Sequence, residues 1–83
     1  MSYKTQYELY LFRDAGDYIV DLREDTITEY GDNIDEEYIE GFIFYRYDEA
    51  LTKFYELVEK YEAKEGELLM WNEMEEPKQR VSN

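Results

Sequence analysis

The sequence predicts an α+β domain in which a small antiparallel sheet of three to four strands packs against one long amphipathic helix. Two observations indicate this. Aromatic and β-branched residues alternate with polar ones near the start of the chain, which is the period of a half-buried strand. Farther along, apolar residues recur at helical spacing over Asp48–Glu65.

The strands are expected at four places. Lys4–Arg13 and Tyr18–Arg23 alternate and flank the turn-forming segment Asp-Ala-Gly-Asp, so they predict a β-hairpin. Tyr38–Arg46 is dense in aromatic and β-branched residues and predicts a third strand, in which Gly41 is the expected position of a bulge. Leu68–Trp71 predicts a short fourth strand.

The stretch Glu24–Glu37 is the part that pattern determines least. It holds seven acids and only three apolar residues, so we expect a loop or a short irregular turn. A helix running from Asp32 through Phe42 is the alternative to the third strand.

The helix has recognisable end signals. Asp48 is placed to act as its N-cap, Lys60 and Lys64 lie in its last turns, and Gly66 is placed to end it. Eighteen residues would give a rod of about 27 Å. Residues 1–73 are expected to form one α+β domain, followed by a flexible C-terminal tail over 74–83.

Charge is the most unusual property of the composition. The 83 residues include 22 acids and nine bases, for a formal net charge of −13. From Asp14 to Glu49, thirteen acids face only Arg23 and Arg46. Repulsion of this size opposes the compact state, so the field is expected to serve a strongly basic protein partner. The same charge disfavours direct binding to nucleic acid or to anionic membranes.

Most catalytic chemistry is excluded by composition. Histidine and cysteine are absent, the serines are Ser2 and Ser82, and the four glycines form no phosphate-binding loop. We therefore expect no enzyme activity and no cofactor. Weak, nonspecific Mg²⁺ or Ca²⁺ binding is compatible with the acids of the run 32–37, but no dedicated metal site is expected.

The acid-dense region supplies the candidate contact residues. Such carboxylates could stand in for phosphates before a groove lined with Lys and Arg, with tyrosines as flanking anchors. Acidity that serves solubility alone is the competing interpretation. The expected partner-binding residues are Asp32, Asp35, Glu36, Glu37 and Glu40, flanked by Tyr30 and Tyr38 and extended by Asp21, Glu24 and Asp25.

In size, charge, lack of His and Cys, and runs such as Asp-Asn-Ile-Asp-Glu-Glu at 32–37, the chain resembles the small acidic inhibitors that phages and mobile elements encode against nucleic-acid enzymes. These include anti-CRISPR proteins, anti-restriction DNA mimics and uracil-DNA glycosylase inhibitors. The resemblance is one of composition over the whole chain, and it implies no particular fold.

What the resemblance implies is a non-catalytic inhibitor in the cytoplasm of the host cell. It would block the basic DNA- or RNA-binding site of a host defence enzyme, with a CRISPR effector nuclease as the first candidate and a restriction enzyme as the second. The alternative is a small acidic adaptor or assembly subunit that binds a protein through an apolar or strand-edge surface. The sequence leaves the target and the oligomeric state open.

Overall fold

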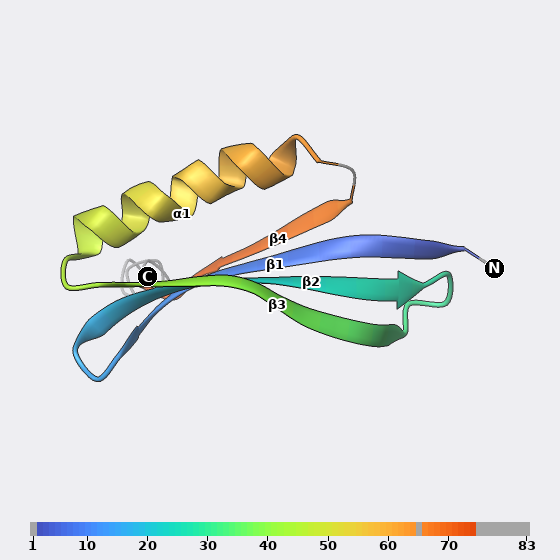
Figure 1. Ribbon diagram of the computed structural model, residues 1–83, viewed down its shortest axis with the longest axis horizontal. Helices are drawn as coiled ribbons and strands as arrows, with labels where there is room; N and C mark the ends of the chain where they lie inside the picture. Colours follow the sequence, from blue (N-terminus) through green and yellow to red (C-terminus); the bar gives the residue numbers. More distant parts are fainter. Residues whose placement is uncertain (1, 65, 75–83) are drawn as a thin grey trace, which may run out of the picture.

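The computed structural model describes residues 2–64 and 66–74, and Figure 1 shows them as a sheet with a helix lying across one of its faces. The α+β class is confirmed. The expected tail over 74–83 lies outside the described residues, apart from Met74 in a turn after the last strand. The elements are β1 (Tyr3–Asp14), β2 (Asp17–Thr28), β3 (Asn33–Phe44), α1 (Tyr47–Glu62) and β4 (Glu67–Asn72).

The sheet has the strand order β3-β2-β1-β4. The pairs β1–β2 and β2–β3 are antiparallel, whereas β4 runs parallel to β1. The expectation of a wholly antiparallel sheet is therefore corrected to a mixed sheet. The reason is the route of the chain, because α1 runs back along the sheet from β3, and β4 then takes the direction that β3 and β1 share.

The strands are longer than the sequence pattern predicted. The stretch 24–37 is not a loop, because β2 continues to Thr28 and β3 begins at Asn33. A four-residue turn joins them, and the Thr28 hydroxyl accepts the backbone N–H groups of Tyr30 and Asp32 within it. The alternative helix through 32–42 is wrong. The expected bulge is also displaced, since the irregularities lie between Leu22 and Arg23 and between Thr26 and Ile27 rather than at Gly41.

The helix is shorter than expected, with 16 residues instead of eighteen. Its N-cap is Arg46 rather than Asp48, whose carboxylate instead receives hydrogen bonds from the Arg46 side chain and the Glu49 backbone N–H. The helix ends before Gly66, with Ala63 as its C-cap. The predicted apolar stripe is confirmed only in part, because Ala50, Phe54, Leu57 and Tyr61 are buried at helical spacing, whereas Tyr55 is 50% exposed.

The core lies between α1 and one face of the sheet. Leu9 pairs with Leu22 and Leu11 with Val20 across β1 and β2, and all four are fully buried beneath the helix. Twelve residues of strand extend about 40 Å, whereas 16 residues of helix extend about 24 Å. The far ends of β1, β2 and β3 therefore project beyond α1 (Figure 1), and no described element covers the opposite face of the sheet.

Candidate functional site

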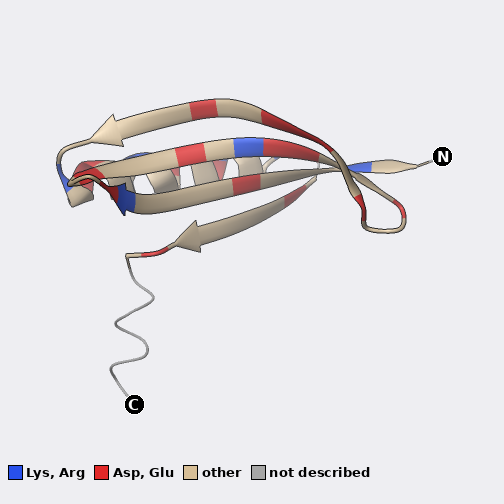
Figure 2. Ribbon diagram, turned by 90° about the horizontal axis from the view of Figure 1, so that it is seen from below, with Lys and Arg blue, Asp and Glu red and all other residues tan. Residues whose placement is uncertain are grey.

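The first half of β3 carries three consecutive exposed acids, Asp35, Glu36 and Glu37, on an edge strand of the sheet. Glu29 and Asp32 in the preceding turn are exposed as well. We call these five residues the acidic edge. Figure 2 shows it as the acidic end of β3 and the neighbouring turn. A strand rises about 3.3 Å per residue and successive side chains point to opposite faces, so Asp35 and Glu37 share one face about 6.6 Å apart, roughly two steps of the spacing of about 3.4 Å per charge along one DNA strand.

The acids of β3 point to both sides of the sheet. In register, Glu37 lies opposite Glu24 on the side of the helix, whereas Glu36 lies opposite Asp25 on the uncovered side. Glu36 is also paired, because Nη1 of Arg23 donates to its Oε1 at 3.0 Å. Asp35 and Glu37 are therefore the less compensated charges of β3, since no ion pair is found for them among the described residues.

The structure separates the other predicted contact residues. Tyr30 stands exposed in the turn next to the acidic edge, and Tyr38 is 59% exposed on β3. Asp21 lies across from Gly41 on the uncovered face, and the Tyr38 hydroxyl reaches the space that a Cβ at Gly41 would fill. Tyr38 and Asp21 thus extend the acidic edge along β3 and β2 on that face.

Besides Asp35 and Glu37, two more of the predicted acids lie on the helix side of the sheet. Glu24 and Glu40 are half-buried, and the charges of both act on the buried Tyr61 of α1. Burial, followed by these two carboxylates, raises the pKa of Tyr61. Both acids thus adjoin the helix packing and lie outside the acidic edge.

Asp25 requires a correction. The sequence placed it among the exposed contacts, but it is 0% exposed although it lies on the uncovered face. The side chains next to it in the register are longer than its own, which explains the burial: Gln6, Glu8, Arg23 and Glu36. A buried side chain cannot be part of the exposed acidic surface.

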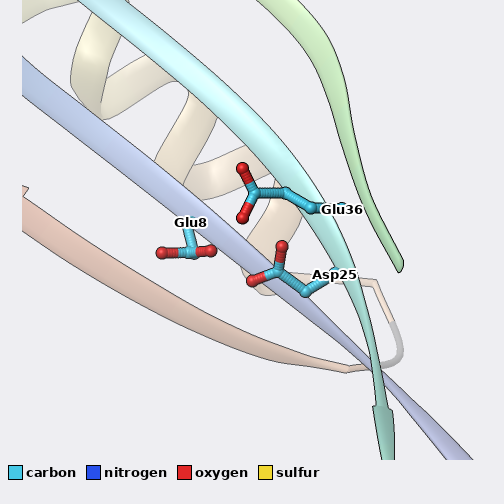
Figure 3. A group of neighbouring side chains, drawn as sticks. All are labelled: Glu8, Asp25 and Glu36. Atoms are coloured by element: carbon cyan, nitrogen blue, oxygen red, sulfur yellow. The ribbon is translucent and has the colours of Figure 1, made fainter. Parts of the chain in front are cut away.

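Asp25 instead belongs to a group of three carboxylates, with Glu8 of β1 and Glu36 of β3. One oxygen of each lies within 4.8 Å of the others, and Figure 3 shows the three converging from adjacent strands. The close approach of the Asp25 carboxyl, followed by burial, raises the pKa of the Glu8 carboxyl, while the Tyr10 hydroxyl that donates to Glu8 acts in the opposite direction.

Sequence reasoning missed Glu8 because its neighbours on β2 and β3 depend on the strand register. The sequence held only one weak indication of the position of Glu8. Strand alternation places Glu8 on the face opposite Leu9, but nothing local places Asp25 and Glu36 beside it. Here the register pairs Glu8 with Arg23, one step along the same face from Asp25.

The uncovered face also carries an apolar surface at its other end. Phe12, Ile19 and Ile43 form a row across β1, β2 and β3, and Ile43 is 68% exposed. Beside this row, Tyr10 stacks on Trp71 of β4. An exposed apolar surface of this kind is a candidate site for contact with another protein.

A hollow of about 690 Å³ lies at the projecting strand ends, between the start of β1 and the turn that joins β2 to β3. Its titratable side chains are Tyr3, Lys4, Glu29, Tyr30 and Glu67. The arrangement offers charge and hydrogen bonds for binding rather than a nucleophile next to a base.

Comparisons with protein-family models, with curated proteins and with solved structures found no match for this chain. None of the described helical residues forms a segment that is long and apolar enough to cross a membrane. Function is therefore inferred from the arrangement of charged and apolar residues.

Proposed function

We propose that this protein is a non-catalytic inhibitor that occupies the basic DNA- or RNA-binding site of a host defence enzyme. A CRISPR effector nuclease is the first candidate target and a restriction enzyme the second, in the cytoplasm of the host cell. The observation that carries the proposal is the acidic edge, five exposed acids within residues 29–37, of which Asp35 and Glu37 lie on one face with no ion pair among the described residues.

The proposed mechanism is steric and electrostatic competition. Asp35 and Glu37 meet Lys and Arg side chains that otherwise hold phosphates, and they are accessible because β3 is an edge strand of the sheet. Tyr30 and Tyr38 contribute apolar contacts that a phosphate backbone lacks, at low entropic cost. Catalysis has no part in this mechanism.

A purely structural role for the same acids has to be separated from this one. Charged residues on an edge strand also prevent the strand from pairing with other chains. Such protection requires charge on the edge but no particular partner. Inhibition of a defined enzyme that disappears when the edge is neutralised distinguishes the two roles.

The test is a cleavage assay with a panel of purified CRISPR effector nucleases and restriction enzymes. At least one should be inhibited, and inhibition should weaken steeply between about 50 and 200 mM salt, as phosphate contacts do. Preloading the target with its nucleic acid should also protect it. The variant Asp35→Asn/Glu36→Gln/Glu37→Gln should lose inhibition.

The matched control is Glu49→Gln/Glu59→Gln/Glu62→Gln, which removes the same charge from exposed positions on α1. It should inhibit as the original protein does. Equal loss of inhibition in the two variants would show that net charge, rather than the acidic edge, is responsible. Absence of inhibition across the panel would reject both candidate target classes.

A second candidate function is favoured by the apolar surface on the uncovered face. A small adaptor or assembly subunit could bind a protein through Phe12, Ile19 and Ile43. Binding of this kind should persist at about 200 mM salt, because apolar contacts are little screened. The variant Ile43→Asp should then abolish partner binding, whereas the neutralised acidic edge should not.

A further inference from the structure

We propose that Glu8, Asp25 and Glu36 form a Ca²⁺ site on the uncovered face of the sheet. The three carboxylates come from three adjacent strands, β1, β2 and β3, and one oxygen of each lies within 4.8 Å of the others. The site shares Glu36 with the acidic edge, but its test requires no target enzyme.

Asp25 has a buried carboxylate oxygen without a hydrogen-bond partner among the described residues. Its side chain is 0% exposed, and its Oδ1 atom has no hydrogen-bond donor among the described residues. The other oxygen, Oδ2, accepts a hydrogen bond from Nε2 of Gln6 at 3.4 Å. A buried carboxylate oxygen without a partner is costly. Figure 3 shows the Asp25 carboxylate directed toward Glu8 and Glu36, where a cation would satisfy it.

The three carboxylates bring like charges close together. Asp25 and Glu36 lie directly opposite each other on antiparallel strands, an arrangement that is destabilising for like charges. With Glu8, the ionised cluster carries three negative charges, and Arg23 returns one positive charge through its bond to Glu36. One divalent cation would neutralise what remains.

Each carboxylate also accepts a hydrogen bond from a side chain outside the cluster. The Tyr10 hydroxyl donates to Glu8, the Gln6 amide to Asp25 and the Arg23 guanidinium to Glu36. Outer hydrogen bonds of this kind fix the orientation of carboxylates that bind metals. The three converging carboxylates are thus oriented by a surrounding group of hydrogen-bond donors.

The nature of the ligands selects the ion. Oxygen-only carboxylate sites favour hard cations. Ca²⁺ accepts carboxylates in flexible geometry, whereas Mg²⁺ demands a near-ideal octahedron and usually keeps several waters. Three carboxylates from three separate strands therefore suit Ca²⁺. Water would complete the coordination on the open side, where Glu36 is exposed.

The test starts from protein stripped of metal with a chelator, in about 0.15 M KCl to screen diffuse attraction. Calorimetric titration with CaCl₂ should show one ion per chain, with a dissociation constant at or below about 1 mM. Tb³⁺, which takes the same oxygen ligands, should show emission excited through Tyr10 and Trp71, because these rings stack beside Glu8.

Two variants and one control locate the site. Asp25→Asn and Glu36→Gln should each weaken Ca²⁺ binding by about tenfold or more. Glu37→Gln removes the same charge one residue away on the opposite face and should change binding by less than about twofold at this ionic strength. Glu36 is exposed, so its variant remains informative if Asp25→Asn fails to fold.

Two results would overturn the proposal. One is the absence of stoichiometric Ca²⁺ binding at about 1 mM, which would leave the cluster as an acid group that shares protons. The other is equal weakening by Asp25→Asn and Glu37→Gln, which would show a diffuse ion atmosphere instead of a site. Neither result depends on whether the protein inhibits an enzyme.

Discussion

The ring of Tyr10 stacks on the ring of Trp71 across the parallel pair of β1 and β4, with centroids 4.8 Å apart and planes 11° from parallel. β4 has only six residues and pairs with β1 alone in the described sheet. On the helix side, Leu68 packs against the core. The ring stack therefore attaches this short strand to β1 on the uncovered face, as the packing of Leu68 does on the helix side.

Trp71→Ala should destabilise the protein by about 2 kcal/mol, because it removes the ring stack and the apolar area that the stack buries. Urea unfolding followed by circular dichroism measures the loss. The matched control is Met70→Ala on the same strand, since Met70 is 51% exposed and Trp71 is 41% exposed. That control should cost less than about 1 kcal/mol. Equal costs would show that the stack contributes nothing beyond ordinary burial.

Gly66→Ala should be among the most damaging single changes outside the core. Gly66 has a φ of +119°, and a Cβ there would lie 2.7 Å from the backbone oxygen of Thr5. Because a strand backbone cannot move aside, the expected cost is about 2 kcal/mol or more. The control is Gly41→Ala, which meets the far end of the exposed Tyr38 side chain and should stay within about 1 kcal/mol. A mild effect of Gly66→Ala in thermal unfolding would contradict the close approach.

High pH should destabilise the packing of α1 through Tyr61. The Tyr61 ring is buried against that of Tyr7, with centroids 4.9 Å apart, and burial raises the pKa of both hydroxyls. A raised pKa in the folded state means that the contribution to stability is complete below the unfolded value of about 10. It is lost as pH rises through the folded value.

Tyr61→Phe should therefore move the midpoint of alkaline unfolding to higher pH, because the phenyl ring keeps the packing and has no proton to lose. Trp71 fluorescence and circular dichroism, recorded against pH, measure the midpoint. Tyr55→Phe on the same helix, at a half-exposed position, is the control and should leave the midpoint in place. An unchanged midpoint in Tyr61→Phe would assign alkaline unfolding to other groups.

Local pattern was sufficient for the elements with a clear apolar period. Leu9 and Leu11 in β1 and Phe54 and Leu57 in α1 are buried as their spacing predicted. The local pattern failed for residues 24–37, where the side chains suggest a loop. There the antiparallel ladder from β1 through β2 to β3 supplies backbone partners that side-chain propensity does not reveal.

The candidate site likewise has one part that the sequence predicts and one part that it does not. Exposure of Asp35, Glu36 and Glu37 follows from composition, because acids in a run are seldom buried. The burial of Asp25 and its approach to Glu8 depend on register and on the length of neighbouring side chains, neither of which a single sequence specifies. The parallel direction of β4 likewise follows from the path of the chain.

The clustering of acids predicts that salt acts in opposite directions on the free protein and on its proposed complex. In the free protein, added ions screen the repulsion of a chain with net charge −13, so thermal stability should rise between about 50 and 200 mM KCl. Over the same range, affinity for a basic target should fall. Differential scanning fluorimetry of metal-free protein, beside inhibition at each salt concentration, measures both.

Neutralising the acidic edge should flatten the rise in thermal stability. Asp35→Asn/Glu36→Gln/Glu37→Gln removes three charges that lie close together, so less repulsion remains for salt to screen. It also releases Arg23, at a cost below about 1 kcal/mol because that ion pair is half exposed. The helix variant Glu49→Gln/Glu59→Gln/Glu62→Gln removes charges spread over about three and a half turns and should keep a steeper rise. If both variants respond to salt alike, the repulsion belongs to the whole surface and the edge has no distinct potential to offer a cationic groove.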